Sequence, residues 1–572
     1  MKLLFRYLSP LRRRMSVGFS IKVLATLLEL TLPYVLSYIL DVVVPLQRIT
    51  PILLWGGGMV LAAAGAYLGN VIANRIAARV ARDAAEQIRH DLFDATMHLT
   101  ARETDRYTIP SLESRLTSDT YNVHHFIGMM QRIGVRAPML LLGGVIITLV
   151  LDWRLALIML AVLPLIGGGV FLIARRGLPL YRKTQTAVDG MVRVVREDCQ
   201  GVRVMKALSR EDYERSRFDT ANRALVENER RAGTVMAASQ PLMTVLLNLG
   251  LVAVIGLGAF FVQGGVSAPG RIIAFMQYFT MLSTAMAVIT RIFAQYSKCM
   301  ASAARIAEVL DTFAAHAANE NTARPAEDAP HILFENVHFS YNGKRQNLTD
   351  LSFSLPRGGT LGIIGATGSG KSTLIQLLMR FYDVDSGRIL LSGEDVRHYG
   401  EKELRARFGV VMQNDVLFAD TIAENIRLGR EISEDRLWRA ARIAQAADFI
   451  EALPDRLEHP LTGKGMNLSG GQRQRVLIAR AIAGDPEILV LDDASSALDY
   501  RTDANLRRAI KEELHATTVV VAQRVSSVMH ADLILVLEDG CVIGAGTHEQ
   551  LLASCPAYKE ISDSQMGGAF LE

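Results

Sequence analysis

A glycine-rich loop near the middle of the chain holds the residues best suited to chemistry. Gly365 to Ser372 fit the pattern G-x-x-x-x-G-K-[ST], which wraps phosphate groups. The glycines let backbone N–H groups converge on phosphate oxygens at the start of a helix, where the helix dipole also favours an anion. Lys371 would supply a cation for the β- and γ-phosphates, and Ser372 a hydroxyl for Mg²⁺. The same residues also allow a simpler interpretation, a glycine-rich turn with no ligand.

The flanking segments predict the elements that position this loop. Ile363 and Ile364 end an apolar run typical of a buried strand, and Leu374 to Arg380 follow with a helical pattern. Further along, Ile488 to Asp492 predict a second buried strand that ends in a carboxylate, a suitable metal ligand. The last 240 residues therefore read as an α/β domain.

The first 300 residues are much more apolar, and the mean hydropathy of the whole chain of 572 residues, +0.21, is high for a soluble protein. Their long uncharged runs are long enough to cross a bilayer as helices. The six predicted spans are Met15–Leu40, Ile49–Asn74, Ala137–Leu151, Leu155–Ala174, Ala232–Gly270 and Ile272–Thr290.

Arginine and lysine set the expected orientation. The loops after the first, third and fifth spans carry one basic residue each, whereas the N-terminus and the other loops are rich in arginine. The positive-inside rule then puts both termini in the cytoplasm. We predict a transmembrane domain over 1–311 with two long helical cytoplasmic loops, a linker over 312–331 and a nucleotide-binding domain over 332–572.

Composition excludes several other classes of protein. The net charge of +4 is too small to argue for nucleic acid. The four cysteines are far apart and form no C-x-x-C pair, which argues against a zinc site or a disulfide framework.

Polar residues inside the spans are candidates for substrate contact. Glu29 is predicted near mid-membrane, where a carboxylate usually faces a cavity or a partner. It would suit a cationic substrate, or it would pair with another helix. Gln277, in the sixth span, would line a water-filled path or join helices.

The order of motifs resembles the ATP-binding cassette (ABC) family. It runs through Tyr341, the phosphate loop, Gln413, the L-S-G-G-Q segment at 468–472 and Asp492. With six preceding spans, the chain is similar to an exporter half-transporter. The resemblance covers nearly the whole chain and implies a multi-domain fold, an all-α transmembrane domain followed by an α/β P-loop NTPase cassette.

The resemblance also implies roles for individual residues. Tyr341 would stack on adenine, although a strand-end tyrosine is the alternative; Gln413 would reach Mg²⁺ or the attacking water, and Asp499 would cross to a partner cassette. The predicted ATP-binding residues are Tyr341, Gly365, Thr367, Gly368, Ser369, Gly370, Lys371, Ser372, Thr373 and Gln413. The predicted metal ligands are Ser372, Gln413 and Asp492. The predicted signature residues, which would complete the ATP site of a partner chain, are Leu468, Ser469, Gly470, Gly471 and Gln472.

Two positions depart from the family pattern. Asp493 stands where the family usually has the glutamate that polarises the attacking water, and Gln523 where it usually has histidine. Aspartate is one methylene shorter, and glutamine cannot carry a charge or transfer a proton as histidine can. The pair resembles the degenerate ATP site of heterodimeric bacterial exporters.

These observations predict an ATP-driven exporter subunit for small amphipathic, multidrug-type molecules in the bacterial plasma membrane. A second, different half-transporter would be its partner, with ATP and Mg²⁺ as cofactors and no nucleic acid. Lipid, peptide or siderophore export stay open, as does a nucleotide-gated regulator or channel. By resemblance, 114–119 and 201–206 in the long loops would dock on the cassettes.

Overall fold

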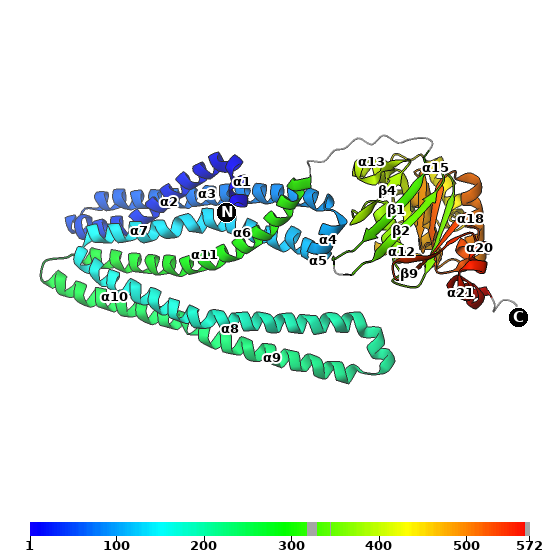
Figure 1. The fold of residues 1–572 in the computed structure, drawn as a ribbon. Helices are drawn as coiled ribbons and strands as arrows, with labels where there is room; N and C mark the ends of the chain where they lie inside the picture. Colours follow the sequence, from blue (N-terminus) through cyan, green and yellow to red (C-terminus); the bar gives the residue numbers. More distant parts are fainter. Residues whose placement is uncertain (317–328, 344, 567–572) are drawn as a thin grey trace. The chain divides into compact units, whose positions relative to one another are not determined.

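The chain forms two compact units. The computed structural model describes residues 1–316, 329–343 and 345–566. The first unit combines Met1–His98 with Ile109–Ala314, and the second combines Leu99–Thr108 with Ala315–Glu572 (Figure 1). Residues 317–328 of the predicted linker lie outside the described residues.

The first unit is entirely helical. Its main helices are α1 (Lys2–Leu8), α2 (Arg12–Tyr38), α3 (Ile49–Met97), α5 (Ile109–Ser114), α6 (Thr120–Met129), α7 (Val135–Leu151), α8 (Trp153–Leu208), α9 (Glu211–Ala237), α10 (Ser239–Gln263) and α11 (Pro269–His316). The short helices between them are η1 (Ser9–Leu11), η2 (Ile39–Val43), η3 (Val44–Leu46), η4 (Arg115–Asp119) and η5 (Met130–Gly134). Small residues let the helices approach closely, since a Cβ on Gly69 of α3 would lie 2.9 Å from the Ala25 Cβ of α2.

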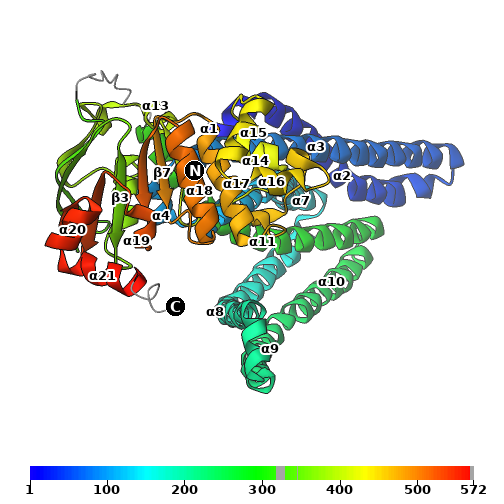
Figure 2. The ribbon, with the colours of Figure 1, turned by 90° about the vertical axis from the view of Figure 1, so that its right-hand side faces the viewer.

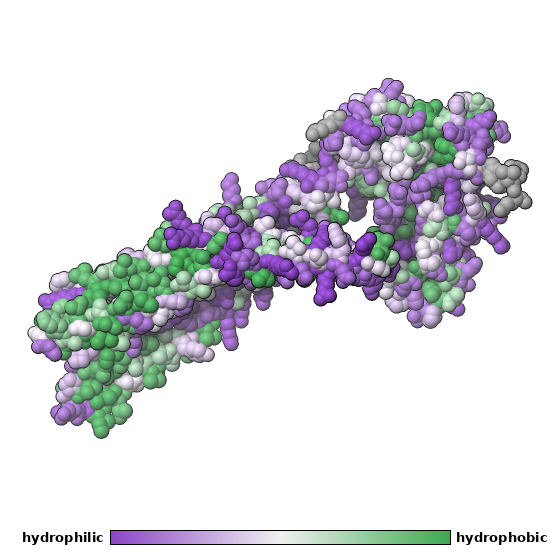
Figure 3. Space-filling view, turned by 90° about the horizontal axis from the view of Figure 1, so that it is seen from below, coloured by the Kyte–Doolittle hydropathy of each residue, from purple (hydrophilic) through white to green (hydrophobic). Residues whose placement is uncertain are grey.

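Large apolar side chains cover much of the outside of this unit. Leu54 and Leu61 of α3 are more than 70% exposed, whereas small residues such as Ala73 and Ala77 of the same helix are buried. Figure 3 shows this apolar surface gathered at one end of the helical unit and polar surface over the rest. Such an inversion is expected where lipid, not water, surrounds the helices.

Five described helical segments are long and apolar enough to cross a membrane. They are Lys2–Leu46, Ile49–Met97, Ile109–Leu151, Trp153–Leu208 and Glu211–Gln263. These contain the first four predicted spans. The fifth predicted span, Ala232–Gly270, is too long at its end, because α10 stops at Gln263 and a turn at 264–268 precedes α11. The sixth, Ile272–Thr290, lies in α11, and the side chain of Thr290 falls outside the described residues.

One segment of the first long loop belongs to the α/β unit, and it is not the predicted segment 114–119. Residues Leu99–Thr108, which include α4 (Ala101–Tyr107), belong to the second unit, and the Tyr382 hydroxyl there donates to Asp105. Residues 114–119 stay in the helical unit. A Thr100–Glu103 capping box starts α4. Residues 201–206 lie within α8, which forms an antiparallel pair with α9 (Figure 1).

The second unit contains two sheets. Their strands are β1 (Ile332–Phe339), β2 (Leu348–Leu355), β3 (Thr360–Gly365), β4 (Ser386–Leu391), β5 (Glu394–Asp395), β6 (Phe408–Val411), β7 (Ile488–Asp492), β8 (Thr517–Val521), β9 (Leu533–Glu538) and β10 (Cys541–Gly546). A four-stranded antiparallel sheet has the order β2-β1-β4-β5. A six-stranded sheet has the order β10-β9-β3-β8-β7-β6, and its strands from β9 to β6 are parallel.

Helices cover these sheets. They are α12 (Lys371–Leu378), α13 (Glu401–Ala406), α14 (Ile422–Arg427), α15 (Glu434–Ile443), α16 (Ala447–Glu451), α17 (Gly470–Ile482), α18 (Tyr500–Glu513), α19 (Val525–Val528), α20 (His548–Ser554) and α21 (Pro556–Met566). Figure 2 shows α14 to α18 gathered on one side of the strands, with α20 and α21 near another edge.

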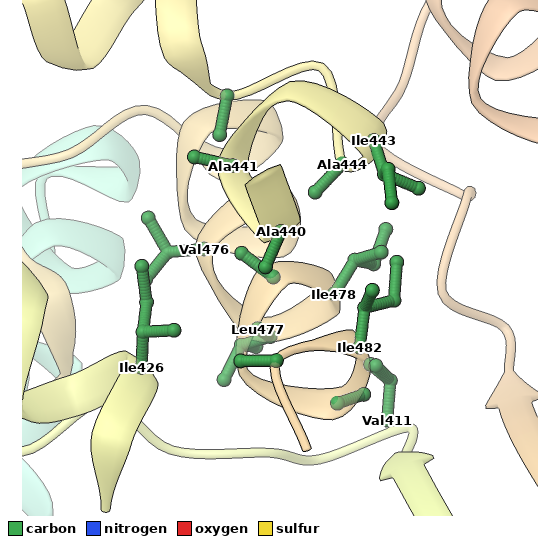
Figure 4. Close-up of a cluster of buried hydrophobic side chains, with 14 of the residues drawn as sticks. Val411, Ile426, Ala440, Ala441, Ile443, Ala444, Val476, Leu477, Ile478 and Ile482 are labelled. Carbon is green, nitrogen blue, oxygen red and sulfur yellow. The ribbon is translucent and has the colours of Figure 1, made fainter. Parts of the chain in front are cut away.

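A buried apolar cluster fixes the position of α17. Val476 and Ile482 of this helix belong to the same buried cluster as Ala440 and Ile443 of α15 and Val411 of β6 (Figure 4). The first residues of α17 belong to the L-S-G-G-Q segment, so this packing sets where that segment points.

A buried polar network joins residues 115–122 to α11 within the helical unit. The Asp119 carboxylate is 1% exposed and accepts hydrogen bonds from the Ser302 hydroxyl at 2.8 Å and the Arg305 Nε at 2.7 Å. Ser302 also accepts from the Asn122 amide at 3.0 Å. Arg115, one helical turn before Asp119, pairs with Glu308 at 3.1 Å. These bonds fix the register of η4 against α11.

We predict that Asp119→Ala will lower the melting temperature of the purified full chain. The substitution leaves Ser302 and Arg305 without their buried acceptor, a loss of about 1–3 kcal/mol. Glu113→Gln is the matched control because Glu113 is an exposed carboxylate on the same segment. Equal melting temperatures for the two variants would contradict a structural role for the network.

Candidate functional site

The ends of four neighbouring parallel strands form the candidate site. Ile363 of β3 pairs with Val521 of β8, and Val521 pairs with Asp492 of β7. Because the carboxyl ends of parallel strands meet at one edge, the segments that follow these strands converge there. They enclose a hollow of about 270 Å³. Its lining residues are Asn347, Thr367, Gly368, Gly370, Lys371, Ser372, Thr373, Gln413, Asp492, Asp493, Val521, Ala522 and Gln523.

The glycine-rich loop has the backbone that its sequence predicts. Gly370 has φ of +101°, and a Cβ there would lie 2.7 Å from the Leu348 Cδ2 atom, so only glycine fits. This residue caps the N-terminus of α12. The Lys371 ammonium donates to the carbonyl oxygens of Gly365 and Ala366 at 2.9 and 2.7 Å. The lysine is therefore held over the loop that would surround the phosphates.

Burial and neighbouring charges oppose each other in the hollow. Burial lowers the pKa of Lys371, while Asp492 and Asp493 act in the opposite direction. Burial also raises the pKa of Asp492, against hydrogen bonds from Ser372 and the Gln413 backbone. The pKa of Asp493 is raised by burial as well, with Lys371 lowering it. A cation and two carboxylates thus share a poorly hydrated site, as an Mg²⁺–phosphate site requires.

Asp493 is held rigidly by its backbone. Its φ is +53°, a conformation that aspartate tolerates better than most residues. Its N–H donates to the Val521 carbonyl at 2.9 Å, and its own carbonyl accepts from the Ser496 hydroxyl at 3.0 Å. The Gln523 amide lies 3.5 Å from the Asp493 carboxylate. The two positions that depart from the family pattern therefore face each other across the hollow.

Tyr341 lies beside the phosphate loop but does not line the hollow. Its hydroxyl donates to the Gln376 amide oxygen at 2.6 Å and accepts from the Thr373 hydroxyl at 3.1 Å, both on α12. Its ring is edge-on to the rings of Phe339 and Tyr382, with centroids 4.8 and 5.0 Å away. The ring thus has a fixed position next to the first turn of α12, and its contact with adenine stays a prediction.

The L-S-G-G-Q segment lies apart from the hollow of its own chain. Ser469 and Gln472 form a capping box at the start of α17, with the serine hydroxyl accepting from the Gln472 N–H at 3.3 Å. None of the residues 468–472, all of which the structure describes, lines the hollow. Ser469 and Gly470 are exposed. Asp499 is also outside it and caps α18 by accepting from the Thr502 N–H at 2.9 Å.

The residues present fit ATP and Mg²⁺. The Ser369 hydroxyl is buried in the loop and has no hydrogen-bond partner among the residues that the structure describes, as expected of a group that a ligand would complete. Ser372, Gln413 and Asp492 all line the hollow and offer the oxygen ligands that Mg²⁺ prefers. Bound there, Mg²⁺ would neutralise charge on the β- and γ-phosphates.

The structure adds three lining residues that the motifs did not identify. Asn347 accepts from the Tyr341 N–H at 3.2 Å and lies just before β2, where no local pattern marks it. Val521 and Ala522 directly precede Gln523, so their contribution follows from the strand end.

Of the two predicted substrate residues, Glu29 has a partner within the protein. Its carboxylate accepts from the Arg136 guanidinium, with Nε at 3.2 Å. This is the pairing with another helix that the sequence offered as the alternative to a cation site. Gln277 is an exposed residue of α11.

Comparisons with known proteins place both units in one family. The family model described as the ABC transporter transmembrane region matches residues 15–286, and the model described as ABC transporter matches residues 348–496. An uncharacterized ABC transporter ATP-binding protein of Mycobacterium tuberculosis is 36% identical, over 98% of each chain. An ATP-dependent lipid A-core flippase of Vibrio parahaemolyticus is 32% identical, over 84% of this chain and 83% of that protein.

A solved structure is similar over almost the whole length. A bacterial Atm1-family ABC exporter with ATP bound has a TM-score of 0.80 and 26% identity, covering 97% of this chain and 98% of that one. The predicted fold class, a helical transmembrane domain followed by an α/β nucleotide-binding domain, is confirmed.

The raised pKa of Asp492 predicts a pH-dependent metal requirement. Mg²⁺ binds the carboxylate and not the carboxylic acid, so Mg²⁺-dependent ATP binding should weaken as pH falls through this raised pKa, above the value of about 3.9 for a free aspartate. Isothermal titration calorimetry over a range of pH, with and without Mg²⁺, measures this change in ATP affinity. Asp492→Asn should remove the Mg²⁺ dependence at every pH, while Asp493→Asn should keep it. A wild-type Mg²⁺ effect that is constant down to about pH 4 would refute this assignment.

Proposed function

Because the chain belongs to the ABC transporter family and is a half-transporter of the exporter type, we propose that it forms the degenerate-site subunit of a heterodimeric exporter. Its own phosphate loop forms the slower of two ATP sites, and its signature segment completes the faster one. The observation that carries this proposal is the pairing of Asp493 with Gln523 at the hollow.

The geometry explains why this site would be slow. The Asp493 backbone is fixed from both sides, so its side chain cannot advance to make up for the missing methylene. A displacement of about 1 Å in a catalytic group can cost on the order of a hundredfold in rate. Gln523 can donate a hydrogen bond to a phosphate but cannot supply the charge of a histidine. ATP would bind here and be hydrolysed slowly.

The exposed signature segment supports a partner chain. Ser469 and the amides at the start of α17 offer an anion-binding helix N-terminus that the hollow of the same chain does not include. In a head-to-tail dimer this N-terminus would cover the ATP of the other chain. ATP binding would then close the cassettes, and hydrolysis would reopen them. We propose that both termini are cytoplasmic in a bacterial plasma membrane, as the arginine-rich loops indicate.

We expect Asp493→Glu combined with Gln523→His to restore hydrolysis in the chain purified alone. The signature is intact, so a dimer of the double variant would contain two complete sites, whereas wild-type dimers would contain two slow ones. Steady-state ATPase in nanodiscs should rise by about tenfold or more, with ATP occupancy unchanged.

Ser469→Ala in the double-variant background is the matched control. It should abolish the gain because each site needs the signature serine of the other chain. Brisk hydrolysis by wild-type dimers, at the rate of the double variant, would show that the site is not degenerate.

The first candidate for the transported molecule is a small multidrug-type amphiphile. The second is a lipid-like anionic amphiphile. Arg136 neutralises Glu29, which removes the carboxylate that a cation would need. Lys22, seven residues before Glu29 on α2, is 3% exposed. Its ammonium group donates to the Asn70 and Asn74 amide oxygens at 2.6 and 3.1 Å, so among the described residues its hydrogen-bond partners are neutral. Relatives named lipid A-core flippase support the same substrate class.

Charge substitutions at this pair separate the candidates. In the ATPase-restored background, Arg136→Gln should reduce stimulation by lysophosphatidylglycerol, because the anion loses a cation and meets Glu29 unpaired. Glu29→Gln should not reduce it. Stimulation by the cation ethidium that is stronger than by the lysolipid, and that is lost in Glu29→Gln, would instead favour a cationic substrate.

A further inference from the structure

A hollow between α2 and α3 combines arginine with an apolar floor. Its volume is about 600 Å³, and its lining residues are Arg13, Arg14, Val17, Ile76, Arg79 and Arg82. All four arginines are exposed. The hollow is far along α2 from Glu29 and does not belong to the ATP site.

The two helices are held in register below the hollow. The Arg14 guanidinium of α2 pairs with Asp83 of α3 at 3.0 Å. One turn further, a Cβ on Gly18 would lie 2.9 Å from Ile76 Cγ2, so the helices touch and close the floor. Lys22 then binds Asn70 and Asn74. The hollow is therefore a fixed feature of the α2–α3 packing.

The charges in the hollow are not balanced. Asp83 is the carboxylate that pairs with these arginines, and it accepts from both Arg14 and Arg82, at 3.0 and 2.8 Å. Among the described residues, the guanidinium groups of Arg13 and Arg79 form no ion pair or hydrogen bond. Four cations face one carboxylate, so an anion is needed to relieve their repulsion. Planar guanidinium groups match phosphate oxygens in a bidentate manner.

The position of the hollow favours a membrane lipid as the molecule that would supply a phosphate group. The charge-free stretch of α3 ends at Asn74, and the arginines of α2 directly precede its apolar stretch, so they border the membrane span on both helices. Val17 is 55% exposed, and Ile72, one turn from Ile76 toward the span, is 48% exposed. An acyl chain would lie on these side chains while its headgroup meets the arginines. Anionic lipids on the cytoplasmic leaflet attract basic groups at this depth.

We propose that this hollow binds the phosphate headgroup of an anionic phospholipid, with Arg13 and Arg79 as the principal contacts. Arg14 and Arg82 are positioned by Asp83 and extend the cationic surface. The site lies at the lipid boundary of the resting chain, so it does not depend on which molecule is transported or on which ATP site is slow.

Native mass spectrometry of the full chain, without nucleotide, tests this site. The probe is dioleoylphosphatidylglycerol, with dioleoylphosphatidylcholine as the zwitterionic comparison. Arg13→Gln with Arg79→Gln should weaken phosphatidylglycerol binding by about tenfold or more and leave phosphatidylcholine unchanged. The matched control is Arg12→Gln with Arg75→Gln, which removes equal charge from neighbouring exposed positions that do not line the hollow. It should change binding by less than about threefold.

Each other outcome overturns the proposal. An equal loss in both double variants would mean diffuse charge attraction and no built site. Equal affinity of the wild type for the two lipids would mean that no anion is recognised. Competition by millimolar glycerol 3-phosphate as effective as that by the lipid would assign the arginines to a soluble anion. Arg79→Gln alone provides a milder variant should the double variant lose its melting transition.

Discussion

The meeting of four parallel strand ends around a glycine-rich loop is the arrangement on which the nucleotide-binding unit depends. No single segment can surround a triphosphate, because its charge needs backbone amides, an ammonium group and a metal site together. The register of β3, β8, β7 and β6 brings these groups from residues as far apart as Lys371 and Gln523 to one hollow. The sheet is a scaffold, and the chemistry lies in the segments after its strands.

The same register makes the site sensitive to small changes in side-chain length. Asp493 is anchored through its N–H to β8 and through its carbonyl to Ser496, so its carboxylate position follows from the backbone. In a mobile loop, one methylene would matter little. In a segment fixed this firmly, it decides whether a carboxylate reaches a water molecule. A displacement of about 1 Å in a catalytic group can cost on the order of a hundredfold in rate, which is the physical basis of the proposed slow site.

The helical unit obeys a different constraint, because lipid surrounds it. Its small residues are buried, its large apolar residues face outward, and polar contacts such as Lys22 with Asn70 occur between helices. Arginines gather where the apolar stretches end. Basic groups at such positions are attracted to anionic lipid headgroups, in addition to the apolar contact that the spans make with acyl chains.

Motif spacing and hydropathy by themselves determined the phosphate loop, the Asp492 strand end, the α/β cassette, the first four spans and most of the fifth, because each depends on a local pattern of residues. They also identified the two altered positions, Asp493 and Gln523. Only the tertiary structure showed that these two residues face each other and that Asn347 lines the hollow. It also showed that Glu29 forms an ion pair with Arg136, and that residues 99–108, not 114–119, belong to the α/β unit. Each of those facts is a pairing between residues distant in sequence, and such pairings follow from packing and register, which no local pattern encodes.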